Sequence, residues 1–262
     1  MRRRVTAVGA VLVAAGIVAL AAGELRAGPD DPPGVRVGKL PAPAAPAFTP
    51  GAPRRLGSTR NVSRWAPVRR PVTARSAPSL EAPAVAKLGT RTPEGTAAIV
   101  AVTDRREDGS GRLWVRASLP VLPNGTMGWV PRRALGGYTT VRTRLDVDLA
   151  HLRLALYRDG RRLLEAPIGV GTSGTPTPRG RFYVRNRLTR YRSPTYGPVA
   201  FGTSARSPTL TDWPAGGYVG IHGTDRPDLL PGRVSHGCIR LRNDDILALA
   251  RHMPVGTPVV VY

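Results

Sequence analysis

Short apolar runs alternate with turn residues along most of the chain after residue 65. Within residues 66–137, each run has the length of a single strand in a small β protein. The runs occupy residues 71–75, 84–88, 97–102, 113–117 and 127–131. Asp108-Gly109 and Asn124-Gly125 separate the later runs and are typical of hairpin turns. We therefore expect a small β-barrel in this part of the chain.

A second β-rich region begins at Tyr138 and is expected to reach the C-terminus. Its first clear element is a half-buried strand with alternating leucines at residues 152–157. Asp159-Gly160 predicts a tight hairpin turn, followed by a return strand over residues 162–168. Further strands are expected at residues 181–185, 218–222 and 259–261.

Two stretches of the second region are expected to be loops. Residues 169–180 hold four glycines and two prolines. Residues 187–211 are polar and contain scattered prolines. A loop of the latter length within a compact domain is often a lid or the wall of a substrate site.

One helix is clear from its apolar spacing. Buried positions follow Ile246 at i+3, i+4 and i+7, which defines a single face. We expect Asn243 to cap this helix, because a short polar side chain there accepts hydrogen bonds from the first turn. Asp244 and Asp245 favour the positive end of the helix dipole, and Pro254 ends the helix.

The N-terminus has the features of an export signal. A basic start, residues 1–4, precedes an uncharged apolar run that ends at Ala22, and Ala19-Leu20-Ala21 is a small-x-small cleavage pattern. We expect residues 1–25 to be a signal peptide or a retained membrane anchor. Eight of residues 28–55 are proline, so residues 26–65 are expected to be a disordered, extended linker.

The net charge of +22 comes from 39 Lys and Arg against 17 Asp and Glu. Such a balance favours an anionic partner. Aromatic residues make up only 5% of the chain, and no basic helix concentrates the charge, which argues against nucleic acid. The anionic cell envelope is therefore the expected partner.

Cys238 is the only cysteine of the chain and cannot form an internal disulfide. A catalytic cysteine needs a nearby base. Two of the four histidines, His151 and His252, fit structural or surface positions, which leaves His222 and His236. The residues alone leave open which of these is the base.

Two further possibilities follow from the same residues. The backbone amides of Gly237 and Cys238 could donate to a developing oxyanion. Alternatively, His222, His236 and Cys238 could be three ligands of a catalytic metal.

Two separated motifs carry a resemblance to a known family. Ile221-His222-Gly223-Thr224 is followed by Ser235-His236-Gly237-Cys238-Ile239-Arg240-Leu241 and Asn243. Upstream, Gly180-Arg181-Phe182 lies within the stretch Thr175-Pro176-Thr177-Pro178-Arg179-Gly180-Arg181-Phe182. Together these motifs resemble L,D-transpeptidases with a YkuD-like catalytic domain. The resemblance covers residues 138–262 and implies a β-sandwich-like domain with one helix after the cysteine.

The resemblance also implies roles for the motif residues. Cys238 would be the nucleophile and His222 its base, with the carbonyl of Gly223 holding the other ring nitrogen. His236 and Gly237 would shape the cysteine loop and the oxyanion site.

Other residues would contact the substrate. Arg240 would face the cleft and meet a substrate carboxylate, for which a guanidinium is suited. Gly223, Ser235 and Tyr218 are assigned to substrate binding, and no metal or organic cofactor is required.

The reaction implied by the resemblance is acyl transfer on peptidoglycan stem peptides. A thioester on Cys238 would be resolved by the amine of a second stem, giving a 3→3 cross-link. Water as the acceptor would give an L,D-carboxypeptidase instead. The export signal places this activity in the cell envelope.

The first β region resembles bacterial SH3-like domains. The resemblance rests on Ala74-Arg75 before Pro78, on Trp114-Val115-Arg116 and on Gly128-Trp129-Val130. Such modules often bind cell-wall peptides, and a non-catalytic wall-binding protein is therefore a further alternative. Trp114 and Trp129 could equally be core residues of a spacer domain.

Overall fold

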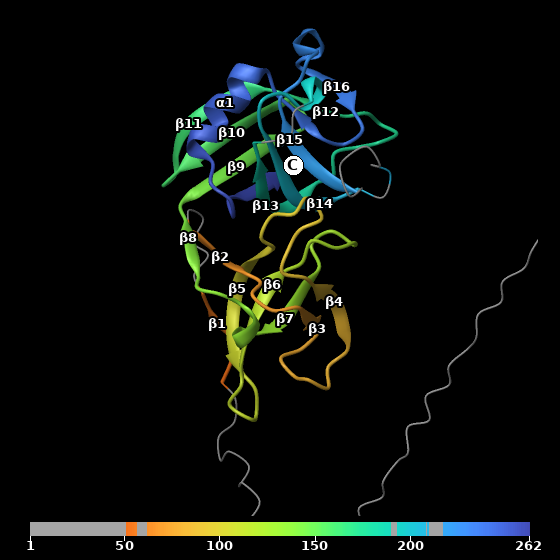
Figure 1. Cartoon of the computed structure of the whole chain (residues 1–262). Coiled ribbons are helices and arrows are strands. Elements are labelled where there is room, and N and C mark those ends of the chain that lie inside the picture. Colours follow the sequence, from red (N-terminus) through yellow and green to blue (C-terminus); the bar gives the residue numbers. More distant parts are fainter. Residues whose placement is uncertain (1–50, 57–61, 190–192, 208, 210–216) are drawn as a thin grey trace, which may run out of the picture. The chain divides into compact units, whose positions relative to one another are not determined.

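The computed structural model describes residues 51–56, 62–189, 193–207, 209 and 217–262. The predicted leader and most of the predicted linker lie outside these residues. All described residues belong to one compact unit, residues 44–262. Within the described part of the chain, no helix is long and apolar enough to cross a membrane. The described fold is mainly β, as predicted (Figure 1).

The first sheet has eight strands, all paired antiparallel. Their order is β4-β3-β7-β6-β5-β2-β8, and β1 pairs with β5. In chain order they are β1 (Arg54–Arg55), β2 (Ser63–Pro67), β3 (Val72–Arg75), β4 (Ala84–Leu88), β5 (Ile99–Glu107), β6 (Leu113–Ser118), β7 (Met127–Pro131) and β8 (Thr139–Val141).

All five strands predicted for the first sheet are present. The bounds of β4 and β7 agree with the prediction, whereas β5 continues through polar residues to Glu107 because it pairs with β6 along its length. The connection at Asp108-Gly109 is longer than a tight turn and spans residues 108–112. Asp108 organises it, because its Oδ1 accepts hydrogen bonds from the backbone of Ser110 and Arg112.

The second sheet has ten strands in the order β11-β10-β9-β18-β13-β14-β15-β17-β12-β16. In chain order they are β9 (Thr143–Asp148), β10 (Arg153–Arg158), β11 (Arg161–Pro167), β12 (Gly169–Gly171), β13 (Gly180–Leu188), β14 (Ala200–Arg206), β15 (Tyr218–His222), β16 (Gly232–Ser235), β17 (Ile239–Arg240) and β18 (Pro258–Val261).

Strand β13 joins the two halves of this sheet. Its first residues, Gly180 to Tyr183, pair with β18, and its later residues, Val184 to Leu188, pair with β14. The halves meeting on one long strand give the β-sandwich-like arrangement that was predicted.

The helices are few and short among the described residues. They are α1 (Asn243–His252) and the 3-10 turns η1 (Arg132–Ala134), η2 (Pro194–Tyr196) and η3 (Pro227–Leu229). Helix α1 contacts β11 (Figure 1). It buries Ile246, Leu249 and Ala250, as the apolar spacing predicted, and it ends before Pro254.

The hairpin predicted at Asp159-Gly160 is confirmed. These two residues connect β10 to β11 and have φ angles of 52° and 82°, the positive values that a type I′ turn requires.

The loop prediction for residues 169–180 is wrong at its start, where Gly169–Gly171 forms β12. Glycine is required at 171 by close packing: a Cβ there would lie 2.2 Å from the carbonyl oxygen of Thr175. The glycines therefore mark a close backbone approach, not only a loop.

The loop prediction for residues 187–211 is wrong at two places, and residues 190–192, 208, 210 and 211 lie outside the described residues. β13 continues to Leu188, and residues 200–206 form β14 between β13 and β15. Six of the seven residues of β14 are buried. A strand covered on both faces has no alternation of polar and apolar residues, so the sequence pattern does not reveal it.

Each sheet has its own apolar core. The first cluster includes Val100, Val115 and Val130, and Trp114 beside it is fully buried. The second cluster includes Phe201 and the inward residues of α1. Since Trp114 and Trp129 are both buried, their core interpretation fits this structure.

The two sheets contact each other through specific residues. The hydroxyl of Tyr183 on β13 donates to the carbonyl of Ile99 on β5 at 3.1 Å. Complete burial raises the pKa of Tyr183 well above its usual range, so this hydroxyl remains a donor. Gly256 packs so closely on Trp65 of β2 that a Cβ would lie 1.9 Å from the indole.

Candidate active site

Two short parallel strands place Cys238 near His222. Cys238 directly precedes β17, and the register of β15 with β17 puts His222 beside Arg240. The backbone N–H of Gly220, two residues before His222, donates to Sγ of Cys238 at 3.3 Å. Alternate residues of a strand share a face and are about 7 Å apart. The thiol and one imidazole therefore occupy neighbouring positions on the sheet, and both are buried.

The orientation of His222 is set by its own backbone neighbour. Nδ1 of the ring lies 2.6 Å from the carbonyl oxygen of Gly223. A carbonyl only accepts, so Nδ1 carries the proton and Nε2 of the neutral ring keeps its lone pair. The ring of Tyr196 packs edge-on against His222, with 4.8 Å between centroids. These contacts define the tautomer that a general base needs.

Asn243 supports this position from the start of α1. The prediction that Asn243 caps the helix is wrong. Helix α1 begins at Asn243 itself, and no side chain caps it. Instead, Oδ1 of Asn243 accepts a hydrogen bond from the backbone N–H of Thr224 at 3.1 Å. A Cβ on Gly197 or Gly223 would lie within 2.4 Å of the same oxygen. The amide therefore fixes the chain just after His222.

The loop before Cys238 is closed by Ser235. Its hydroxyl donates to the carbonyl of Cys238 at 2.6 Å and accepts from the backbone N–H of Gly237 at 3.1 Å. The Gly237 amide, which we expected as an oxyanion donor, is thus engaged within the loop. Gly237 has a φ of 118°, a conformation that side chains of L-residues rarely adopt.

A turn some 60 residues earlier in the chain braces this loop. The hydroxyl of Thr177 donates to the carbonyl of Gly237 at 2.9 Å and accepts from the backbone of Gly171. The hydroxyl of Thr175 donates to the carbonyl of Ser235 at 3.2 Å. Both threonines belong to the upstream motif, but the sequence assigned them no role.

Arg240 and His236 differ in exposure and surroundings. Arg240 is half-buried, and its buried Nε has no hydrogen-bond partner among the described residues. His236 is exposed, whereas Cys238 and His222 are buried. Arg240 thus offers an unused donor beside His222.

Comparisons with known proteins found several relatives of this chain. A family model of the L,D-transpeptidase catalytic domain (YkuD) matches residues 142–261. The “Putative L,D-transpeptidase YkuD” of Bacillus licheniformis is 36% identical over 122 residues, which is 47% of this chain and 67% of that protein. The chain belongs to the L,D-transpeptidase family.

Other relatives show how much of the protein this likeness covers. The “Probable L,D-transpeptidase ErfK/SrfK” of Salmonella typhimurium is 38% identical over 144 residues. The match spans 47% of this chain but only 45% of that relative. The solved catalytic domain of an E. faecium L,D-transpeptidase is 33% identical, with 46% of this chain and 96% of that domain covered and a TM-score of 0.35.

Tyr218 lies at the opposite end of β15 from His222 of this L,D-transpeptidase domain. Its ring packs between the guanidinium groups of Arg185, at 3.8 Å, and Arg206, at 4.5 Å. Its hydroxyl donates to the carbonyl of Pro120 at 3.3 Å. These contacts place Tyr218 at the boundary of the two sheets.

The metal alternative for this L,D-transpeptidase domain finds no support in the geometry. Across the described ranges, no three His, Cys, Asp or Glu side chains are grouped to hold a metal ion. His222, His236 and Cys238 are therefore not arranged as a ligand set.

Sequence reasoning missed three contributors to the site. Tyr196 was hidden in the stretch assigned to a lid, and Thr177 was only part of a motif. Asn243 was given the wrong partner, because an N-cap is the usual local role of asparagine before a helix.

Proposed function

We propose that this protein is an acyltransferase of peptidoglycan stem peptides that forms a thioester on Cys238. One observation carries the proposal: Sγ of Cys238 accepts from Gly220 on β15, and His222 at the end of that strand has its Nδ1 committed to Gly223. A nucleophile, an adjacent base and a group that orients the base are the features that covalent catalysis requires.

The first half-reaction transfers the acyl group to the enzyme. Nε2 of His222 takes the thiol proton, and the thiolate attacks the carbonyl carbon of the third stem residue. The C–N bond to the leaving D-alanine then breaks, and His222 returns the proton to the departing amine. The thioester remains on Cys238.

The second half-reaction frees the enzyme. The side-chain amine of a second stem attacks the thioester, His222 accepts its proton, and Cys238 leaves as the thiolate. The product is a 3→3 cross-link. Water as the acceptor would release the shortened stem and make the enzyme an L,D-carboxypeptidase.

Arg240 is proposed to bind a carboxylate of the substrate. Its Nε is buried without an acceptor among the described residues, and it lies in register with His222. An unpaired buried donor costs free energy, which an anionic ligand would recover through a charge-assisted hydrogen bond. His236 and Gly237 are proposed to shape the cysteine loop.

The test is mass spectrometry of the protein after incubation with a stem tetrapeptide or a carbapenem. We expect a covalent adduct on Cys238, and none on Cys238→Ala. Turnover of the tetrapeptide by the Cys238→Ala protein would overturn the proposal. Inactivation by a chelator but not by a thiol reagent would favour the metal hydrolase instead.

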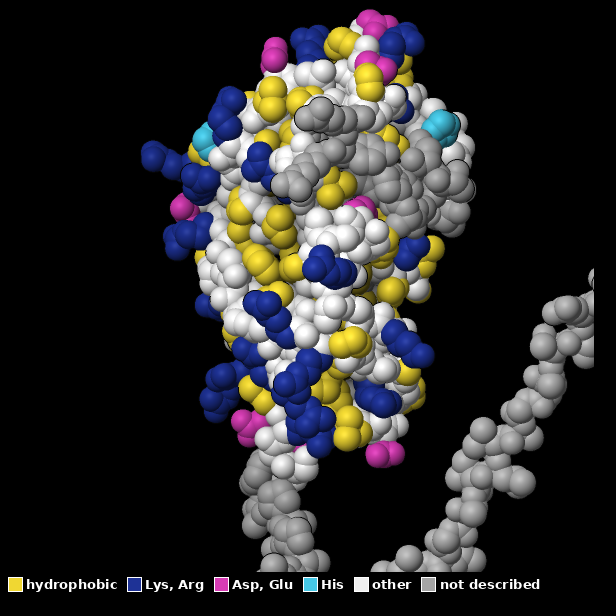
Figure 2. All heavy atoms as spheres, viewed as in Figure 1, with side chains coloured by type: hydrophobic (Ala, Val, Ile, Leu, Met, Phe, Trp, Pro, Cys, Tyr) yellow, Lys and Arg dark blue, Asp and Glu magenta, His cyan; other side chains and the backbone are white. Residues whose placement is uncertain are grey.

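The remaining features are proposed to place the enzyme at the cell wall. The chain carries an N-terminal export pattern and a net charge of +22. Figure 2 shows Lys and Arg side chains spread over the visible face and few acidic ones. This surface suits the anionic envelope. We also propose that residues 66–137 are an SH3-like domain that binds wall peptides.

A further inference from the structure

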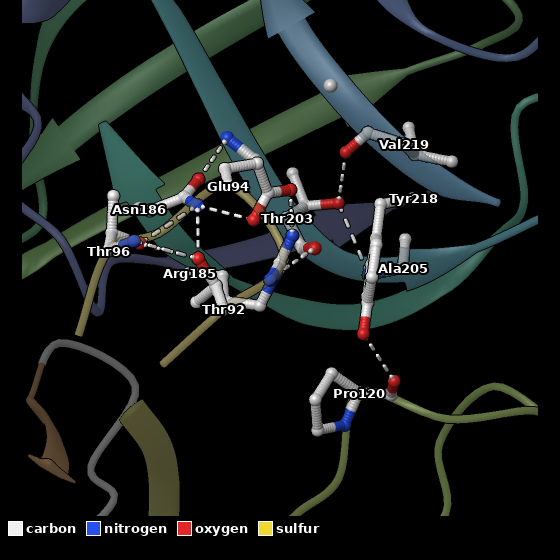
Figure 3. Close-up of polar contacts among 12 residues, drawn as sticks. Thr92, Glu94, Thr96, Pro120, Arg185, Asn186, Thr203, Ala205, Tyr218 and Val219 are labelled. Carbon is white, nitrogen blue, oxygen red and sulfur yellow. Dashed lines mark hydrogen bonds and ion pairs between the residues drawn. The ribbon is translucent and has the colours of Figure 1, made fainter. Parts of the chain in front are cut away.

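A cavity lies where the two sheets meet, and the mechanism proposed above does not use it. Its walls come from both sheets: from β4 and the chain that follows it, from residues 98–100 at the start of β5, and from Arg185, Arg206 and Tyr218 of the second sheet. Its volume is about 210 Å³. Figure 3 shows part of this boundary, where Tyr218 contacts Pro120 in the connection between β6 and β7.

The charged groups that line this cavity are all cationic. They are Lys87, Arg91, Arg185 and Arg206. Arg185 is neutralised by an ion pair with Glu94. For the other three, no ion pair with an acidic residue occurs within the described ranges. The cavity therefore has an excess of positive charge, which an anion would balance.

Arg206 supplies an unused donor at this place. Its guanidinium stacks over the ring of Tyr218 at 4.5 Å, which holds the group in one orientation. Its Nε is buried and has no hydrogen-bond partner among the described residues. A buried donor of a charged group without an acceptor costs free energy, so an anionic ligand at Arg206 would be bound favourably.

The remaining lining is mainly aliphatic. Val68, Leu88, Val100, Pro120 and Val121 form much of the wall. An inorganic anion would leave these side chains unused, whereas a small apolar group beside a carboxylate would contact them. At about 30 Å³ for each water, the volume holds about seven waters, which is the size of a single amino-acid residue and its carboxylate.

We propose that this cavity binds the C-terminal carboxylate of a short peptide that ends in a small aliphatic residue such as alanine. Arg206 and Lys87 bind the carboxylate, and the aliphatic wall contacts the last side chain. The inference goes beyond the proposed acyl transfer, because it concerns a second site. None of Cys238, His222 and Arg240 lines this cavity.

The test is isothermal titration calorimetry of the full chain with N-acetylalanine. The amide of the same compound, which lacks the charge, and inorganic phosphate, which lacks the methyl group, are the comparison ligands. We expect N-acetylalanine to bind at least tenfold more tightly than either. Equal binding of the amide or of phosphate would overturn the proposal.

Variants assign the binding to the cavity. Arg206→Gln should weaken binding of N-acetylalanine about tenfold, the loss expected for one charge-assisted hydrogen bond. Lys87→Gln should weaken it about threefold, since Lys87 is exposed and its replacement is compatible with folding. Arg161 is exposed on β11, outside the cavity. Its replacement in Arg161→Gln removes the same charge and should leave the affinity for N-acetylalanine unchanged.

The variant Arg240→Gln tests whether N-acetylalanine binds in this cavity or at the Cys238 site. If Arg240→Gln abolishes binding and Lys87→Gln leaves it unchanged, the ligand occupies the Cys238 site and the proposal is wrong. Because the readout is binding, a failure of the proposed thioester chemistry would not affect the result.

Discussion

Arg185 and Glu94 form a buried ion pair that connects the two sheets (Figure 3). Nη2 of Arg185, on β13, lies 2.6 Å from Oε1 of Glu94, and the side chains are only 3% and 4% exposed. Asn186 donates to the other carboxylate oxygen of Glu94 at 3.1 Å. Arg185 also donates to the carbonyl of Thr203 on β14. The carboxylate of Glu94, in the connection between β4 and β5, thus neutralises a cation on β13 in the second sheet.

Removing the charge of Glu94 should destabilise the fold. In Glu94→Gln the guanidinium of Arg185 stays buried without a counter-charge, and the expected loss is about 3 kcal/mol of unfolding free energy. Urea unfolding followed by circular dichroism measures it. The matched control is Asp228→Asn, whose pair with Arg226 is about 60% exposed and is screened by solvent, so its loss should have a much smaller effect. Equal effects of the two variants would mean that the buried pair is not structural.

Replacement of His222 and replacement of His236 should have different effects on the rate of acylation of Cys238. His222→Ala removes the group with a fixed Nδ1 beside the thiol, and we expect at least a 100-fold slower adduct formation on Cys238. His236→Ala changes an exposed residue and should slow the reaction less than tenfold. Stopped-flow measurement of carbapenem acylation checks both rates. A larger effect of His236→Ala would assign the base to the other histidine.

Thr177 should act as a positioning residue for the cysteine loop. Thr177→Val keeps the shape but removes the hydroxyl that donates to Gly237, so the loop loses its brace. We expect an acylation rate about tenfold lower and a stability loss of about 1–3 kcal/mol. Thr177→Ser retains the hydroxyl and should restore the rate. A Ser variant as slow as the Val variant would exclude the hydrogen bond as the cause.

Asp108 should make stability depend on pH in the acid range. Burial would raise its pKa, but hydrogen bonds from Ser110, Trp114 and Arg112 outweigh it and lower the pKa from 3.8 to about 2. A lowered pKa contributes stability above pH 3.8 that is lost as pH falls toward 2.

The measurement for Asp108 compares the native chain with Asp108→Asn by urea unfolding between pH 2 and 6. The native chain should be more stable by on the order of 1–2 kcal/mol at pH 6, since partial exposure screens the effect, and the difference should shrink toward pH 2. The exposed Glu81→Gln is the control. A difference that does not change with pH would contradict the ionised role of Asp108.

Much of the fold was predictable because its signals are local. The turn at Asp159-Gly160 depends on two residues that tolerate positive φ, and the buried face of α1 depends on spacing within ten residues. Strand β9 also carries a local signal, because the apolar residues Leu145 and Val147 alternate with charged residues. Strand β14 carried none, since both of its faces are covered.

The sequence by itself determined the chemistry available to this protein: one thiol, Cys238, and a His222-Gly223 pair whose ring and carbonyl are adjacent in the chain. Only the tertiary structure decided which imidazole lies near that thiol, because the register of β15 with β17 is set by neighbouring strands. The brace from Thr177 and the pair of Arg185 with Glu94 are likewise contacts between distant segments. Such contacts follow from the order of strands in a sheet, which no short stretch of sequence encodes.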